Sequence, residues 1–279
     1  MLRNRQLTIP PNVGCNIERN QRRLKLRLKR CIFVQKETMN KNTVKYKPLI
    51  DRAVKQFWNT RNKQLKGQST RNIKDAGNRG AVTGGKQLNG FLELFKTVAK
   101  DVGIPEECIY IKGNIIPGYF RPTKDWDMLI ISPSKKLISV IELKSQVGSF
   151  GNNFNNRTEE ALGSAVDLWT AFREKAFPNQ IAPWLGYFLM VEKSDKSTTP
   201  VRISEPHFKS FPEFQGSSYL ERYKILCEKL MLERHYTQCG LMWAKNDFTY
   251  GNVEESISIE SFISSFIGHL IGQLNEFSS

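Results

Sequence analysis

Glu142 and Lys144 stand two positions apart in a largely apolar run, residues 137–144. Glu142 is the only acidic residue of the chain that is followed two positions later by a lysine. Side chains alternate between the two faces of a strand, so these two groups would project from the same face. A carboxylate and an ammonium group placed in this way could act together on one substrate.

The run that carries this charge pair predicts a central strand, because apolar residues fall on both sides of its alternation. One face is expected to hold Ile138 and Val140, and the other Leu137, Ile141 and Leu143. A strand that is covered on both faces normally excludes charged side chains. The pair therefore calls for a functional explanation.

A second strand is predicted just upstream, over residues 126–131, and residues 132–136 have the composition of a turn. We therefore expect a β-hairpin with its tip near Ser134 and Lys135. In that register the numbers of paired residues sum to about 269, so Asp127 lies opposite Glu142 with Cβ atoms roughly 5 Å apart. A shift of one residue would turn Asp127 to the other face.

Two carboxylates at that separation repel each other unless a cation lies between them, and oxygen ligands with room for water suit Mg²⁺. The metal would polarise a phosphate and activate a water, while the Lys144 ammonium would orient that water. Asp127, Glu142 and Lys144 therefore predict phosphodiester hydrolysis. The alternative is a surface strand with an ion pair, since Asp…Glu-x-Lys is a loose pattern.

Longer stretches around these residues resemble the XhoI family of type II restriction endonucleases. They read PGYFRPTK at 117–124, followed by Trp126-Asp127, then ELKSQVG at 142–148 and FGNNFNNRTEEA at 150–161. The resemblance continues through DLWTA at 167–171, FPEFQG at 211–216 and YL at 219–220. It covers the chain from roughly residue 49 onward.

This resemblance implies a PD-(D/E)xK nuclease fold, an α/β fold with a central mixed β-sheet flanked by helices. It further implies Mg²⁺ dependence and a homodimer that cleaves double-stranded DNA at CTCGAG, leaving 5′-phosphate ends. By motif, Asp127 and Glu142 take the two acidic positions and Lys144 the lysine position, with the main-chain carbonyl of Leu143 as a further metal ligand. Trp126 departs from the superfamily motif, which has proline there.

Two segments are expected to be loops that contact DNA. Residues 66–86 are rich in glycine and basic residues, and residues 148–156 are rich in asparagine and precede a helix expected from Asn156 to Phe172. Amide and guanidinium groups can read bases or bind phosphates. The candidate DNA-binding residues are Arg71, Arg79, Lys86, Gln146, Asn152, Asn153, Asn155, Asn156 and Arg157. The alternative for the asparagines is that they only form turns.

Further helices are predicted at residues 51–65, 88–101, 219–235 and 260–274, and further strands at 184–191 and 238–244. Glu93, on the second of these helices, is either a further metal ligand or a solvated residue. Residues 80–86 fit the pattern GxxxxGK of a phosphate-binding loop, but Gln87 stands where Ser or Thr should bind Mg²⁺. No nucleotide cofactor is therefore expected.

Charge and length suggest one large α/β domain, residues 48–279, and a basic N-terminal extension, residues 1–47. Eleven of the fifteen net positive charges fall within residues 1–50. Three interpretations of the extension stay open: a segment that binds phosphates, a disordered tail, or an artefact of the gene model, with the true start at Met39.

The five cysteines and three histidines form neither a zinc pattern nor a disulfide framework, and the longest apolar run, residues 184–191, is too short to span a bilayer. We expect a cytoplasmic prokaryotic protein with double-stranded DNA and no membrane as partner. Two alternatives to a restriction enzyme stay open: a structure-specific repair or recombination nuclease, and a non-catalytic DNA-binding protein.

Overall fold

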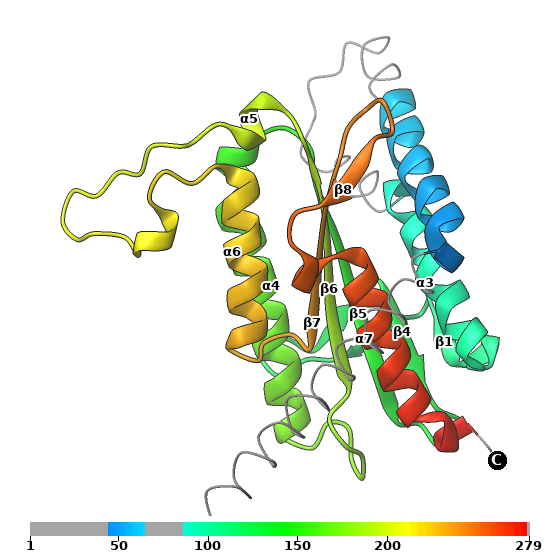
Figure 1. Cartoon of the computed structure of the whole chain (residues 1–279). Coiled ribbons are helices and arrows are strands. Elements are labelled where there is room, and N and C mark those ends of the chain that lie inside the picture. Colours follow the sequence, from blue (N-terminus) through cyan, green and yellow to red (C-terminus); the bar gives the residue numbers. More distant parts are fainter. Residues whose placement is uncertain (1–43, 65–85, 278–279) are drawn as a thin grey trace, which may run out of the picture. The chain divides into compact units, whose positions relative to one another are not determined.

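A six-stranded mixed sheet lies at the centre of the computed structural model, in the spatial order β1-β4-β5-β6-β7-β8 (Figure 1). The strands are β1 (Ile109–Tyr110), β4 (Met128–Ile131), β5 (Leu137–Gln146), β6 (Trp184–Glu192), β7 (Gln238–Ala244) and β8 (Tyr250–Asn252). β5, β6 and β7 run parallel, and the outer pairs are antiparallel. The expected mixed sheet is confirmed.

The structure describes residues 44–64 and 86–277. Residues 45–279 form one compact unit, and nearly all of the basic extension lies outside the described residues. Arg71 and Arg79, with most of the glycine-rich segment, also lie outside them.

Helices cover both faces of the sheet (Figure 1). They comprise residues 44–64, α3 (Asn89–Val102), α4 (Phe150–Arg173), the short α5 (Asp195–Thr198), α6 (Tyr219–Leu232) and α7 (Ile259–Gly272). Short 3₁₀ helices occur at Glu106–Cys108, Pro212–Phe214, Glu255–Ile257 and Leu274–Phe277. None of the described helices is both long and apolar enough to cross a membrane.

Each face of the sheet has its own apolar core. Helix 44–64, α3 and α7 pack on one face in a cluster that includes Ile141 and Leu143 of β5. On the opposite face, α4 and α6 pack in a cluster that includes Val140 of β5 and Tyr187 of β6. β5 is therefore buried on both faces, as the sequence predicts.

The predicted hairpin and its register are confirmed. Residue numbers of the pairs Met128↔Ile141 and Leu129↔Val140 both sum to 269. The register then shifts, so that Ile131 pairs with Leu137 and β5 contains one additional residue, a β-bulge.

The bulge reverses the alternation of side chains at the start of β5. Ile138 packs with Ile141 and Leu143, whereas Leu137 packs with Val140. The predicted assignment of Ile138 and Leu137 to faces is therefore wrong, although it holds from residue 140 onward.

The predicted loop at residues 148–156 is also wrong, because α4 already begins at Phe150. Gly148 and Ser149 form the turn before it, with φ values of 64° and 44°. Phe150 is buried and its ring stacks on Tyr219 of α6, with the ring centroids 5.9 Å apart. Tertiary packing of an apolar residue thus extends the helix through a sequence whose asparagines favour turns.

A separate two-stranded sheet pairs β2 (Ile115–Pro117) with β3 (Thr123–Asp125). The segment after it leads directly into β4, and the Trp126 N–H donates to the Asn114 carbonyl at 3.1 Å. This small sheet carries Lys124 to the site described next.

Candidate active site

Asp127, Glu142 and Lys144 come together where β4 begins beside β5. The Asp127 N–H donates to the Ile141 carbonyl at 3.2 Å, just before the first residue pair of the two strands, Met128↔Ile141. The Leu143 N–H in turn donates to Asp127 Oδ2 at 2.6 Å. Lys144 Nζ forms an ion pair with Glu142 Oε1, so their predicted common face is confirmed.

The Glu142 carboxylate is close enough to affect the ionisation of Asp127. Burial and the negative charge of Glu142 raise the pKa of Asp127 to about 6, although the Leu143 N–H opposes the shift. Glu142 itself is buried, with 4% of its surface exposed. A cation between the carboxylates would relieve this repulsion.

Lys144 is held in its charged form. Burial lowers its pKa, but the charge and hydrogen bond of Glu142, together with Asp127, outweigh burial and raise the pKa above its usual value. The ammonium can therefore act as a hydrogen-bond donor and a positive charge across the neutral pH range.

Sequence reasoning missed a second lysine at the same carboxylate. Lys124 Nζ lies 3.1 Å from Glu142 Oε2, and its side chain is 12% exposed. The same nitrogen lies 4.3 Å from the centroid of the Trp126 ring. The spacing of Lys124 and Trp126, two positions apart, is compatible with their contact across one face of an extended segment, but no sequence signal connects Lys124 with Glu142.

The two carboxylates alone would give a sparse metal site. Within residues 44–64 and 86–277, no group of three or more His, Cys, Asp or Glu side chains is placed to hold a metal ion. Mg²⁺ typically uses one or two carboxylates and completes its shell with water and substrate phosphate oxygens. The pair Asp127 and Glu142, which repel each other when both are charged, fits that pattern.

Glu93 is not brought to the site. It is exposed on α3, whose apolar side packs on the face of the sheet that carries Ile141 and Leu143. Glu142 stands between Ile141 and Leu143 in β5, so its side chain projects from the opposite face of the sheet. The expectation that Glu93 assists a metal is therefore not supported by its position.

Gln146 and Arg157 are turned inward. Gln146 is buried, and its amide donates to the Gly148 carbonyl at 2.5 Å. Arg157 forms an ion pair with Glu160 at 2.5 Å and reaches the Ser145 carbonyl at 3.5 Å. In this conformation Gln146 supports the turn before α4, and a direct DNA contact by it is not supported.

The asparagines of the family-like segment lie on the first turns of α4. Asn152, Asn155 and Asn156 are exposed, and Asn153 is half-buried. α4 follows the end of β5 after only the turn at Gly148 and Ser149, so these side chains lie just beyond the strand that carries Lys144. Lys86 is exposed at the start of the second described segment.

A clamped loop joins β2 to β3. Asp167 of α4, which is 2% exposed, accepts hydrogen bonds from the N–H groups of Tyr119 and Phe120, both at 2.8 Å. Its other oxygen lies 2.8 Å from Arg121 Nε. A Cβ atom at Gly118 would lie 2.5 Å from this carboxylate, so the close approach requires glycine. The rings of Tyr119 and Phe120 remain exposed.

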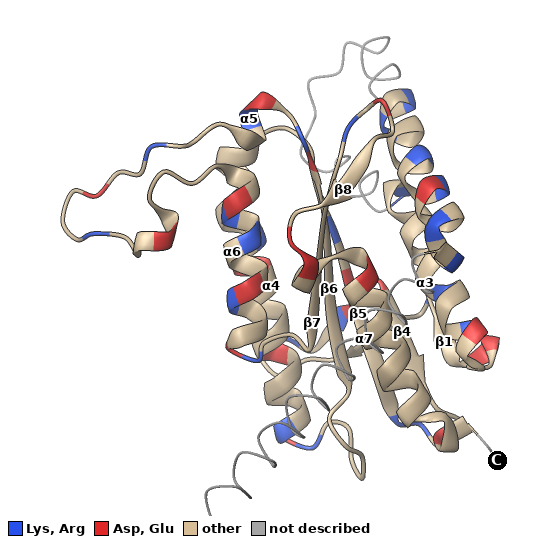
Figure 2. Cartoon of the chain, viewed as in Figure 1, with Lys and Arg blue, Asp and Glu red and all other residues tan. Residues whose placement is uncertain are grey.

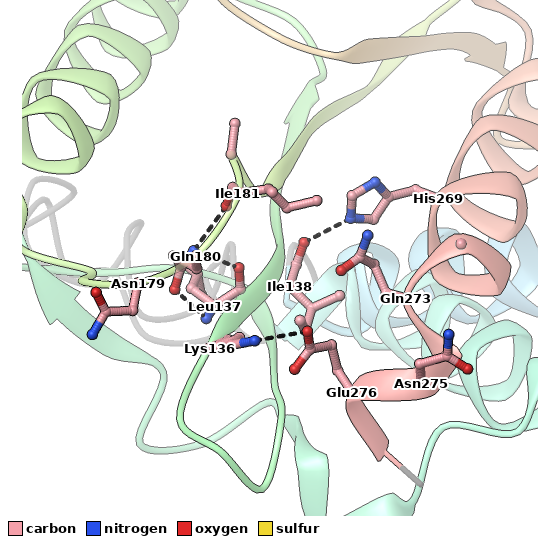
Figure 3. A pocket seen from close by; sticks show the side chains of 12 residues that line it. Lys136, Leu137, Ile138, Asn179, Gln180, Ile181, His269, Gln273, Asn275 and Glu276 are labelled. Carbon is pink, nitrogen blue, oxygen red and sulfur yellow. Dashed lines mark hydrogen bonds and ion pairs between the residues drawn. The ribbon is translucent and has the colours of Figure 1, made fainter.

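The pocket in Figure 3 lies at the other end of β5, between Leu137 and Ile138, residues 179–182 and the end of α7. Its polar groups bond to one another: Gln180 binds both main-chain groups of Leu137, and His269 binds the Ile138 carbonyl at 3.0 Å. Ile138 is four residues from Glu142, roughly 13 Å along a strand. This pocket is therefore not the active site.

Comparison with known proteins identifies relatives over the same region. A family model described as restriction endonuclease XhoI matches residues 67–255, which include Lys124, Asp127, Glu142 and Lys144. The type II restriction enzyme BstVI of Geobacillus stearothermophilus is 48% identical over 219 residues, covering 75% of this chain and 95% of that protein.

The type II restriction enzyme XhoI of Xanthomonas vasicola is 46% identical over 192 residues, covering 67% of this chain and 76% of that protein. No solved structure gives a significant match. The chain therefore belongs to the restriction endonuclease XhoI family and is a site-specific deoxyribonuclease.

Proposed function

We propose that this enzyme hydrolyses double-stranded DNA at CTCGAG with Mg²⁺ and leaves 5′-phosphate and 3′-hydroxyl ends. The observation that carries the proposal is the cluster of Asp127, Glu142 and Lys144 at the β4–β5 hairpin. Two features of the chain support assignment to the PD-(D/E)xK fold. They are the mixed sheet with helices on both faces and the hairpin that carries the acids and the lysine.

In this proposal Asp127, Glu142 and the main-chain carbonyl of Leu143 would hold the metal. Mg²⁺, when bound, supplies a Lewis acid that polarises the scissile phosphate and acidifies a bound water. Asp127 is oriented for this task by the Leu143 N–H. Lys144, kept protonated by its neighbours, orients the attacking water and offsets charge on the phosphate oxygens.

DNA contacts are assigned to groups around this cluster. The exposed side chains Asn152, Asn155 and Asn156 offer donors and acceptors for base edges. Lys86, with Arg71 and Arg79 outside the described residues, would bind phosphates. Because CTCGAG is a palindrome, we propose a twofold-symmetric homodimer, acting in the prokaryotic cytoplasm.

A plasmid with a single CTCGAG site tests this function. The full chain is incubated with the plasmid and Mg²⁺, and the ends are sequenced and tested for ligation. The control plasmid differs by one base pair within the hexamer, and a third substrate carries a branched junction. Ligatable ends at the hexamer alone are expected.

Other outcomes would contradict the proposal in distinct ways. Cleavage of both plasmids at another sequence would refute the target while keeping a site-specific nuclease. Cleavage confined to the junction would favour a structure-specific nuclease. Intact DNA that is nevertheless bound would favour a non-catalytic DNA-binding protein.

A further inference from the structure

Both oxygens of the Glu142 carboxylate face an ammonium group. Lys144, from the same strand, pairs with Oε1, and Lys124, from β3 of the small sheet, lies 3.1 Å from Oε2. Glu142 is buried, so two positive charges meet one negative charge in a site largely shielded from water. The Lys144 contact is fixed by strand geometry, because the two residues stand on one face of β5.

This arrangement conflicts with metal binding at the same carboxylate. A metal ion held by Asp127 and Glu142 needs an oxygen of Glu142, and Lys124 occupies Oε2. Two cations at one oxygen repel each other strongly in a site of low dielectric. Lys124 and the metal must therefore compete.

The Trp126 ring offers Lys124 a second favourable contact. The ammonium lies 4.3 Å from the ring centroid, within the range of a cation–π interaction. Trp126 is 3% exposed and packs in the core, so the ring is fixed in place. Lys124 can therefore leave Glu142 without losing all stabilisation of its charge.

We propose that Lys124 is a positioning residue that occupies the metal-binding oxygen of Glu142 in the DNA-free enzyme and lowers its affinity for divalent metal. This inference rests on the proposed metal site. It also gives Trp126, which stands where the superfamily motif has proline, a task as the platform for that lysine.

Binding of Mn²⁺ to the DNA-free full chain tests the inference, with free Mn²⁺ counted by electron paramagnetic resonance. Removing the competing charge in Lys124→Met should tighten Mn²⁺ binding on the order of tenfold. Lys124→Arg keeps the charge and should bind Mn²⁺ like the wild type. Unchanged or weaker binding by Lys124→Met would overturn the inference.

Two further variants separate this inference from the proposed function. Lys193→Met removes another lysine–tryptophan contact, 4.2 Å from the Trp243 centroid, and should leave Mn²⁺ binding unchanged. Glu142→Gln sets the baseline for a lost metal ligand. If the wild type and Lys124→Met both bind Mn²⁺ no better than Glu142→Gln, the proposed metal site is refuted. If they bind Mn²⁺ equally well and better than Glu142→Gln, the metal site stands and only the inference on Lys124 is refuted.

Discussion

At the scale of single residues, the site depends on how buried charges are balanced. Asp127 alone would be driven toward its neutral form, since burial and Glu142 raise its pKa to about 6. Lys124 and Lys144 both form ion pairs with the Glu142 carboxylate. A metal ion at this carboxylate would therefore meet two competing ammonium groups.

Loss of either proposed catalytic group should strongly reduce cleavage but spare DNA binding. Glu142→Gln removes a metal ligand, and Lys144→Met removes the group that orients water. Each should reduce the cleavage rate by about 10²–10⁴-fold, the range typical of such groups. Gel-shift affinity for a CTCGAG duplex should stay close to that of the wild type. Cleavage at the wild-type rate by either variant would refute its assigned role.

Two residues of the site could not be inferred from local pattern. Asp167 looked like one polar position in a helix, and its role depends on N–H groups 47 and 48 positions away in sequence. Lys124 lies outside the hairpin that the acids define, and only the packing of the small sheet brings it to Glu142. Neither contact has a sequence period that would reveal it.

At the scale of elements, the hairpin was predictable and the bulge was not. A turn composition and an alternation of apolar residues are local signals, and they gave the correct register of residues 128–130 against residues 139–141. The bulge at Ile138 and the early start of α4 depend on tertiary packing, for example of Phe150 on Tyr219. Sequence patterns therefore located the acids and the lysine but misjudged the elements on either side.

Substitution of Gly118 tests whether Asp167 constrains the loop between β2 and β3. In Gly118→Ala the added Cβ would lie 2.5 Å from Asp167 Oδ2 and 2.9 Å from the Arg121 carbonyl, so the loop must move. We expect the free energy of unfolding to fall by about 1–3 kcal/mol, measured by urea denaturation.

Gly163→Ala is the matched control for this substitution. No atom lies within 4 Å of a Cβ added at Gly163, which is exposed within α4. Alanine should stabilise the helix there by up to about 1 kcal/mol. Equal effects of the two substitutions would show that the Asp167 clamp does not constrain the loop.

His269 of α7 gives the fold an acid-sensitive contact. Burial lowers its pKa, although its hydrogen bond to the Ile138 carbonyl opposes the shift. The folded protein therefore binds this proton less readily than the unfolded chain, and stability should fall as pH drops below about 6.5.

Comparison with His269→Gln isolates this effect. Asp127, whose pKa is raised, changes the pH dependence of stability in the opposite direction, but it does so equally in both proteins. The free energy of unfolding, measured between pH 8 and pH 5, should fall more in the wild type than in the variant. Parallel pH profiles would mean that His269 does not titrate between the two states.

At the scale of the whole molecule, charge is divided unevenly along the chain. Eleven of the fifteen net positive charges lie within residues 1–50. In the described part, basic and acidic residues are interspersed along α6, with pairs such as Lys224 and Glu228, whereas helix 44–64 carries six basic residues and one acid, Asp51 (Figure 2). Much of the electrostatic attraction to DNA should therefore come from the N-terminal segment.

Neutralising that segment in the full chain tests this division. The variant carries glutamine at six positions: Arg22, Arg23, Lys25, Arg27, Lys29 and Arg30. Each lost phosphate contact should reduce the salt dependence of affinity for a non-target duplex, by up to about 0.9 in the logarithmic slope. Cleavage of the hexamer at low salt should persist. An unchanged slope of affinity against salt would show that these residues do not contact DNA.

Asp127 and Glu142 are proposed to hold one metal ion beside the scissile phosphate. A crystal structure of the full chain with Mn²⁺ and a duplex that contains CTCGAG tests this arrangement through the anomalous signal of manganese. We predict a peak bonded to one oxygen of each carboxylate, with Lys144 facing the phosphate. Manganese bound elsewhere, with these carboxylates free of metal on an engaged duplex, would contradict the account.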